Sequence, residues 1–357
     1  MKLRRKQIAF ALSLAGIFAI TCNAQNIKVK NATSWEVTGR VQLQHAASNS
    51  IDGTASKTNN GFRIRRGRFQ VKAKLSPYIS TKFQIEARDN SPKLKDAEGK
   101  LKFGKSTYLR FGQFKVPVWR EELRSSSKLM LVERSAVASE LSDFKLSARH
   151  IGVELAGGNK DGFTFALNYS NGAGEGGRED AGRTKKTFTN NGKLLAGRVN
   201  LPLGPNFELG VSAASNSVGN SLADINATGT IKMVAPDFGI YIDSGDDSKI
   251  VIEGGFVKGK ADAAVVETGD LDFTLMDVTA KFMKKMENAN ESFAGLDALE
   301  VAAGFSTVDS IEKYSVLRVG PAMYFGSKTR FQVNFEIENP ESGDAITKFR
   351  SQMTFNF

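Results

Sequence analysis

Residues 35–45 read WEVTGRVQLQH, and apolar and polar side chains alternate one by one along this stretch. The first set is Trp35, Val37, Gly39, Val41 and Leu43, and the second is Glu36, Thr38, Arg40, Gln42 and Gln44. Successive side chains of a β-strand point to opposite faces, so the pattern predicts a strand with one face toward lipid or a core and the other toward water. A soluble β-sandwich and a membrane β-barrel both produce such strands.

The same alternation recurs in segments of about ten residues, which suits a tilted strand that crosses a bilayer. We expect sixteen strands, at residues 35–45, 62–75, 79–88, 95–103, 107–114, 148–157, 162–170, 193–201, 206–215, 229–243, 249–259, 271–283, 298–307, 313–325, 329–338 and 346–357. An even number of antiparallel strands places both ends of the sheet on the same side of a membrane.

The connections between these strands favour the membrane barrel. One side carries mostly short connections, at residues 76–78, 104–106, 158–161, 202–205, 244–248, 284–297 and 326–328. The other side carries long ones, at residues 46–61, 115–147, 171–192 and 216–228. Short periplasmic turns and long external loops are typical of outer-membrane barrels. Two features fit less well: the connection 284–297 is long for an inner turn, and Pro236 predicts a bulge or break in its strand.

The two ends of the chain carry export and assembly signals. Four basic residues precede an apolar run from Ile8 to Ile20, which predicts a secretory signal peptide at 1–24, a short lead at 25–34 and a single barrel domain at 35–357. Without the signal, 45 basic residues face 38 acidic ones, and no cysteine remains because Cys22 is the only one. The alternating last strand ends at Phe357, which resembles the signal read by the bacterial barrel-assembly machinery.

The connection at 115–147 is the candidate for function, since so long a loop in a compact barrel is usually functional. It leaves the outer end of the fifth predicted strand, so we expect it to be the third external loop and to fold into the lumen. Charged side chains inside a barrel decide which ions pass. Hydroxyl groups suit a partly desolvated oxyanion because they donate hydrogen bonds.

Two stretches carry a resemblance to a known family. Residues 62–78 read FRIRRGRFQVKAKLSPY, and residues 112–135 read GQFKVPVWREELRSSSKLMLVERS. Together they resemble the phosphate-selective porin O and P family, whose pattern has an Arg-rich second strand, then Gly-Gln-Phe-Lys-x-Pro, Glu-Glu-Leu, a serine pair and Glu-Arg-Ser. The match covers roughly residues 62–135, and Ser127 makes the serine pair a triplet here.

The resemblance implies a sixteen-stranded barrel, usually trimeric, whose basic side chains guide oxyanions to a site framed by the third loop. The matching positions are Arg65, Arg66, Arg68, Lys115, Ser125, Ser126, Lys128 and Arg134. Alternation refines this set, because Arg66, Arg68, Lys72 and Lys74 fall in the lumen phase and Arg63 and Arg65 in the lipid phase. The candidate pore-lining residues are therefore Arg66, Arg68, Lys72, Lys115, Ser125, Ser126, Lys128 and Arg134.

Structural roles compete with solute binding at these positions. Glu36, Glu86 and Glu154 fall in the lumen phase and would neutralise part of the basic strand. The serines would equally cap a short helix at 128–134. The carboxylates of the loop, Glu121, Glu122 and Glu133, are expected to cap a helix or to tie the loop to the wall.

We interpret the chain as a passive outer-membrane channel that prefers anions, with phosphate or related oxyanions as the specific hypothesis. The expected partners are small anionic solutes, outer-membrane lipid, the assembly machinery and two further copies in a homotrimer. No cofactor, metal or nucleic-acid motif is expected. The alternatives are a general, weakly selective porin and a plugged barrel that serves as adhesin or anchor. A barrel hydrolase around Ser147 and His150 is a minor alternative, since their order fits no known signature.

Overall fold

The computed structural model describes residues 33–50, 59–88, 91–159, 161–177, 192–218, 229–245, 247–266 and 269–357. These residues form sixteen strands: β1 Ser34–Ser48, β2 Asn59–Lys74, β3 Ile79–Arg88, β4 Ser91–Phe103, β5 Thr107–Lys115, β6 Arg149–Gly158, β7 Thr164–Ser170, β8 Leu194–Pro202, β9 Phe207–Val218, β10 Gly229–Asp243, β11 Ser248–Ala261, β12 Leu271–Asn290, β13 Leu296–Asp309, β14 Lys313–Phe325, β15 Thr329–Pro340 and β16 Ile346–Asn356. The predicted signal peptide at 1–24 and most of the lead lie outside the described residues.

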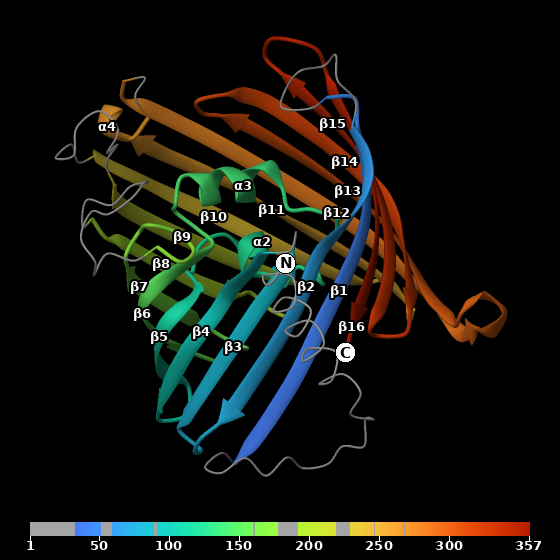
Figure 1. Ribbon diagram of the computed structural model, residues 1–357, viewed down its shortest axis with the longest axis horizontal. Coiled ribbons are helices and arrows are strands. Elements are labelled where there is room, and N and C mark those ends of the chain that lie inside the picture. The colour runs from blue at the N-terminus through green and yellow to red at the C-terminus, as the bar shows by residue number, and fades with distance from the viewer. Residues whose placement is uncertain are drawn as a thin grey trace, which may run out of the picture.

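Each strand pairs antiparallel with its neighbour in sequence, and β1 pairs with β16, so the sheet is a closed barrel (Figure 1). The sixteen predicted strands are confirmed in number, order and approximate position. Closure satisfies every sheet edge, as a lipid environment requires. No helix among the described residues is long and apolar enough to cross a membrane.

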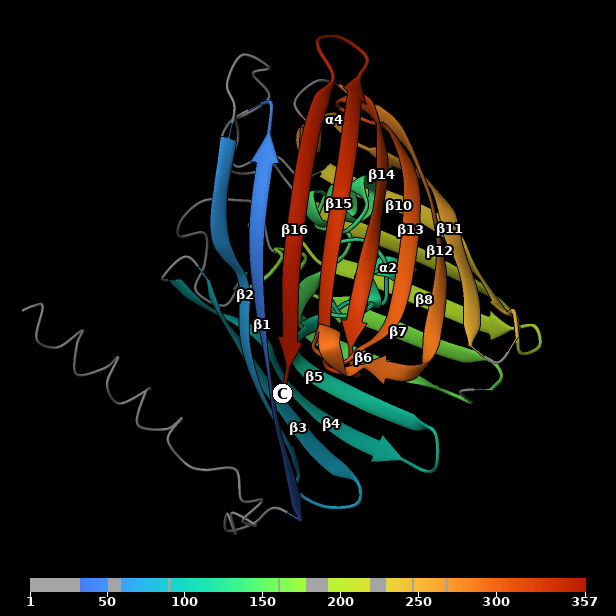
Figure 2. The ribbon, with the colours of Figure 1, turned by 90° about the vertical axis from the view of Figure 1, so that its right-hand side faces the viewer.

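The last residue, Phe357, extends the pairing at the seam between β1 and β16. Gly39 and Phe357 exchange backbone hydrogen bonds of 2.7 and 3.1 Å, which continue the ladder to Phe357. Figure 2 shows the C-terminus beside β1. A Cβ atom on Gly39 would lie 2.2 Å from the Phe357 ring. The ring therefore lies over the space that a side chain at residue 39 would fill.

The pleat separates an apolar outer face from a polar inner face. On β1 the outward Val37 and Leu43 are exposed, whereas the inward Gln42 and Gln44 are almost fully buried. On β15 the outward Phe335 and Ile337 are exposed and the inward Gln332 is 1% exposed. Apolar side chains outside and polar ones inside is the arrangement of a barrel that lies in lipid.

The connection between β5 and β6 lies inside the barrel, and we call residues 116–148 the inner loop. It carries the short helices α2, Arg120–Leu123, and α3, Ala136–Asp143, which both views place within the ring of strands (Figures 1 and 2). Ser135 caps α3 by accepting a 3.3 Å hydrogen bond from the Ala138 N–H. The predicted helix at 128–134 is wrong, because these residues form no helix and the capping serine is Ser135 rather than Ser125–Ser127.

The structure differs from the expected strands and connections at four places. The prediction of a long inner turn at 284–297 is wrong. Strand β12 continues to Asn290, and a 3₁₀ turn, η1, Glu291–Phe293, leads into β13. The strand around Pro236 is unbroken, and its register with β11 is the same on both sides of the proline. A short helix, α4, Ala263–Val266, follows β11.

The fourth difference is a β-bulge in β2, and it corrects the predicted direction of two arginines. Gln42 pairs with Arg66 and the next residue, Leu43, pairs with Ile64, so Arg65 is the extra residue. The bulge reverses the phase of the residues before it. Arg63 consequently pairs with the inward Gln44, and both Arg63 and Arg65 contact Glu133 of the inner loop instead of lipid.

Candidate functional site

An apolar cluster fixes one side of the inner loop to the barrel wall. Val116, Val118, Trp119, Val137 and Leu141 are buried against inward apolar side chains of β8 to β13, among them Leu194, Met233 and Leu275. Apolar packing therefore holds the loop on this side. Cavities between loop and wall are lined by β1 to β6, by β14 to β16 with β2, and by β5 to β9.

Ion pairs within the loop hold its two arms together. The buried Glu122 forms ion pairs with Arg134, whose Nε lies 2.6 Å away, and with Lys115, whose Nζ lies 3.1 Å away. Arg134 also donates to the Arg124 carbonyl at 2.8 Å, and Glu121 accepts from the Ser135 hydroxyl at 2.5 Å. Glu121 and Glu122 are therefore structural ties of the loop.

The middle of the loop crosses the lumen to reach the opposite wall. Ser126 contacts β1 and β2, and the Met130 carbonyl accepts from Gln332 on β15 at 3.2 Å. Glu133 accepts from Arg65 Nε and Nη2 at 2.5 and 2.8 Å, and from Gln44 at 3.1 Å. The loop is thus attached on both sides and divides the interior.

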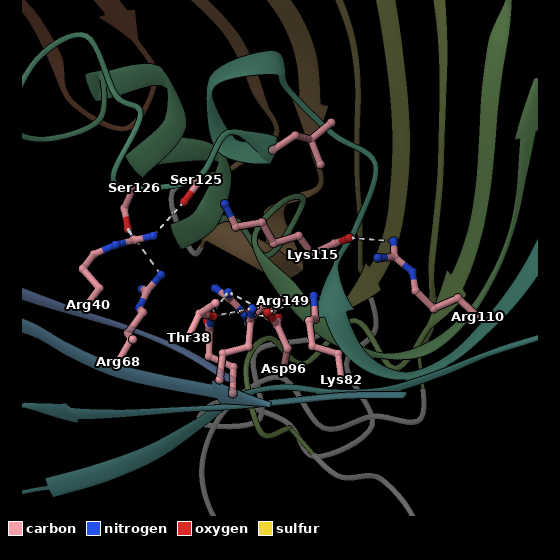
Figure 3. Close-up of a pocket in the computed structure, with 14 residues that line it drawn as sticks. Thr38, Arg40, Arg68, Lys82, Asp96, Arg110, Lys115, Ser125, Ser126 and Arg149 are labelled. Carbon is pink, nitrogen blue, oxygen red and sulfur yellow. Dashed lines mark hydrogen bonds and ion pairs between the residues drawn. The ribbon is translucent and has the colours of Figure 1, made fainter. Parts of the chain in front are cut away.

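A cavity of about 370 Å³ lies between the loop and the strands β1 to β6 (Figure 3). Its lining includes Ser125, Ser126 and Leu123 from the loop, and six cationic side chains face a single lining carboxylate, Asp96. The cations are Arg40, Arg68, Lys82, Arg110, Lys115 and Arg149. A site of this kind concentrates anions because its walls are predominantly positive.

Most of these cations are matched by carboxylates on neighbouring strands. Arg68 lies 2.5 Å from Glu86, and Arg110 lies 2.5 Å from Glu154. Asp96 binds Arg149 at 2.7 Å and Lys82 at 3.2 Å. Such pairs lower the net field at the cavity, and they explain how a narrow lumen holds many charged groups.

Arg40 differs from the other lining cations because it pairs with no carboxylate of the described residues. Its Nη1 donates to the Ser126 hydroxyl at 2.7 Å and its Nη2 to the Ser125 hydroxyl at 3.0 Å (Figure 3). Its Nε donates to the Asn356 side-chain oxygen at 3.0 Å. Arg68 Nη1 donates to the same Ser126 hydroxyl at 3.3 Å. A guanidinium without an ion-pair partner among the described residues therefore meets two hydroxyl groups at the loop.

The structure divides the candidate residues among three places. Arg68, Lys115, Ser125 and Ser126 line the 370 Å³ cavity. Arg66 and Arg134 line a second cavity of about 600 Å³, and Lys72 lines a third of about 280 Å³ near Glu36, with which it pairs at 2.9 Å. Lys128 is exposed, and its ammonium group makes no ion pair with the described residues.

The 600 Å³ cavity lies toward the end of the barrel at which β2 begins and β13 is joined to β14. Arg63, Arg65, Arg66 and Arg350 line it together with five acidic residues, among them Glu133 and Glu336. Burial raises the pKa of Glu133, but the hydrogen bond and charge of Arg65 and the charge of Arg66 lower it to about 2. Glu133 is therefore ionised at neutral pH.

The residue that sequence reasoning missed is Arg40. Its position in the lumen phase of the first strand was visible, but the contacts with the serines join residues that are 85 and 86 positions apart. Nothing in the local sequence indicates that Arg68 and Arg110 are neutralised while Arg40 is not.

The fold and the basic, loop-narrowed lumen define a sixteen-stranded membrane barrel of the porin class. A comparison with protein families matches residues 36–241, more than half of the chain, to the phosphate-selective porins O and P. The chain belongs to this family, which places it among outer-membrane channels rather than enzymes.

Solved structures support the fold. The anion-selective porin from Comamonas acidovorans is 13% identical, with a TM-score of 0.64 over 91% of this chain and 99% of that one. The outer-membrane channel DcaP of Acinetobacter baumannii is 12% identical, with a TM-score of 0.61 over 92% and 99%. The trimer form of OmpT from Vibrio cholerae is 12% identical, with a TM-score of 0.59 over 91% and 99%. No curated protein matches the chain.

Proposed function

We propose that this protein is a diffusion channel of the bacterial outer membrane that prefers anions, and oxyanions such as phosphate in particular. The observation that carries this proposal is Arg40, whose guanidinium has no carboxylate partner among the described residues and faces the cavity beside Ser125 and Ser126. The family to which the chain belongs and the anion-selective porin among its structural neighbours support the same function.

The serine hydroxyls complete the site because of their hydrogen-bonding capacity. The oxygen of Ser126 accepts from Arg40 and from Arg68, so its own O–H is directed to another acceptor. A tetrahedral oxyanion presents several acceptor oxygens, which suit a hydroxyl donor and a guanidinium together. Chloride is a single atom, so it binds less favourably than a tetrahedral oxyanion to this arrangement of donors. The channel performs no covalent chemistry, and solutes pass down their gradients.

We propose the pore-lining set Arg40, Arg66, Arg68, Lys72, Lys115, Ser125, Ser126, Lys128 and Arg134, with different weights. Arg40, Arg68, Ser125 and Ser126 contact one another at the cavity. Lys115 and Arg134 act mainly through Glu122, which they hold in place. Lys72 and Lys128 lie apart and contribute to the field of the lumen.

The experiment that tests the proposal is the reversal potential of the refolded protein in a planar bilayer under a KCl gradient. We expect the sign of an anion-selective pore, and we expect added phosphate to reduce the chloride current. A potential near zero that phosphate leaves unchanged would overturn the anion preference.

A general, weakly selective porin is the second candidate, and the dense pairing of the lining cations favours it. Arg68, Arg110 and Arg149 each have a carboxylate within 2.7 Å. If these pairs cancel the electric field of the lumen, the channel passes small neutral solutes, anions and cations alike.

We further propose that residues 1–24 are a signal peptide for export into the periplasm, and that Phe357 is read during assembly. The functional unit would be a homotrimer in outer-membrane lipid, a proposal that the trimeric OmpT among the structural neighbours supports.

A further inference from the structure

The arrangement around Glu133 is an oxyanion-binding geometry that a side chain of the chain itself occupies. Both carboxylate oxygens of Glu133 bind the Arg65 guanidinium, at 2.5 and 2.8 Å. Arg66 lies 3.4 Å from one oxygen and Arg63 3.8 Å from the other, and Gln44 donates at 3.1 Å. A bidentate guanidinium with further donors is how proteins bind carboxylates and phosphates.

Among the described residues, cations outnumber carboxylates in the immediate contacts of this point. Three guanidinium groups lie within 3.8 Å of one carboxylate, because the bulge at Arg65 turns Arg63 and Arg65 into the lumen beside Arg66. This carboxylate carries a single charge. A doubly charged oxyanion carries more charge and more acceptor oxygens than the carboxylate does.

A solute from the external side has access to the cluster. The 600 Å³ cavity beside it is lined by Arg63, Arg65, Arg66 and Glu133 themselves. The side chain of Arg63 is 47% exposed and that of Glu133 is 18% exposed. Glu133 also lies on an irregular segment of the loop, which neutral hydrogen bonds at Met130 and Val132 attach to β15. When the carboxylate is displaced from the arginines, these hydrogen bonds keep the backbone of the segment attached.

We propose that Glu133 is an internal competitor for a doubly charged oxyanion, which exchanges with its carboxylate at the arginine cluster as the solute enters from outside. This inference deepens the proposed function and rests on it. Conduction requires a site that attracts the solute but does not retain it. Glu133 supplies the second condition, because it returns to the arginines as the oxyanion leaves and shortens the time that the oxyanion stays bound.

The test is the concentration of sulfate or hydrogenphosphate that halves the chloride current when it is added on the external side. Glu133→Gln keeps the size of the side chain and removes the competing charge, so we expect half-block at a concentration about tenfold lower than in the wild type. The matched control is Glu336→Gln, which removes a carboxylate that pairs with Arg350 and Lys348 in the same cavity. We expect this control to shift the half-block concentration by less than about threefold.

Equal shifts in both variants would overturn the proposal, because they would show a general effect of charge in the cavity. An unchanged or higher half-block concentration in Glu133→Gln would also overturn it and leave Glu133 a structural tie. If Glu133→Gln does not fold, Glu133→Asp keeps the charge but shortens the reach, and we expect a smaller shift in the same direction. Failure of the proposed function is a separate result, namely a wild-type reversal potential without anion preference.

Discussion

The Arg40 guanidinium donates a 2.7 Å hydrogen bond to the hydroxyl of Ser126, and this contact joins the first strand of the barrel to the inner loop. Ser126 is 2% exposed, and its oxygen also accepts from Arg68. Two guanidinium groups of like charge therefore share one neutral acceptor. Their mutual repulsion is relieved when an anion enters the cavity beside them.

Replacement of Ser126 by alanine should weaken both the loop contact and the binding of oxyanions. The change leaves Arg40 and Arg68 without this acceptor. An unsatisfied buried donor lowers the free energy of unfolding by about 1–3 kcal/mol. We expect phosphate to block the chloride current less effectively in Ser126→Ala than in the wild type. Ser127→Ala is the matched control, because the Ser127 hydroxyl contacts only that of Ser125 among the described residues, at 3.2 Å. Equal loss of phosphate block in both variants would contradict the role of Ser126.

The attachment of the loop by Glu133 should persist far into acid. The pKa of Glu133 falls from about 4.5 to about 2 in the folded protein. A folded value below the unfolded one gives stabilisation that is fully present above pH 4.5 and is lost as the pH falls toward 2. The free energy of unfolding of the wild type relative to Glu133→Gln should therefore be constant above pH 4.5 and shrink between these two values. Urea titrations across this range measure it, and a difference that does not change with pH would contradict the ion pair.

The barrel seam should tolerate no side chain at residue 39 while Phe357 is present. A Cβ atom there would meet the Phe357 ring at 2.2 Å, so Gly39→Val should destabilise the refolded barrel by about 1–3 kcal/mol. Phe357→Ala makes room, and the double variant should therefore lose less than the sum of the two single changes. Thermal unfolding of protein refolded in detergent, without assembly machinery, measures the four proteins. Additive losses would show that ring and glycine do not interact.

The barrel could be predicted from the sequence because alternation and loop length report on the strands directly. Each strand must present apolar side chains to lipid, so residues 35–45 and 329–338 reveal their faces without tertiary information. The extension of β12 to Asn290 was missed because the residues after Lys284 no longer alternate.

The site was harder to predict because its contacts are long-range. The bulge at Arg65 changes the direction of Arg63, and the only local hint is the adjacent pair Arg65 and Arg66, which breaks the alternation. Arg40 has no carboxylate partner among the described residues, and this depends on where the neighbouring strands place their carboxylates. Lys115 ends β5 and Arg134 lies in the inner loop, and their shared partner Glu122 follows only from the folded loop.

The central claim is that Arg40 gives the lumen its preference for anions, and the reversal potential of Arg40→Gln under a KCl gradient tests it most directly. Loss of one unneutralised charge in a wet lumen is worth about 1 kcal/mol, which is about a fivefold change in the anion-to-cation permeability ratio. Arg110→Gln removes a cation that is already paired with Glu154 and serves as the control. We predict that the potential of Arg40→Gln moves toward zero by more than that of Arg110→Gln. A wild-type potential in Arg40→Gln would contradict the account.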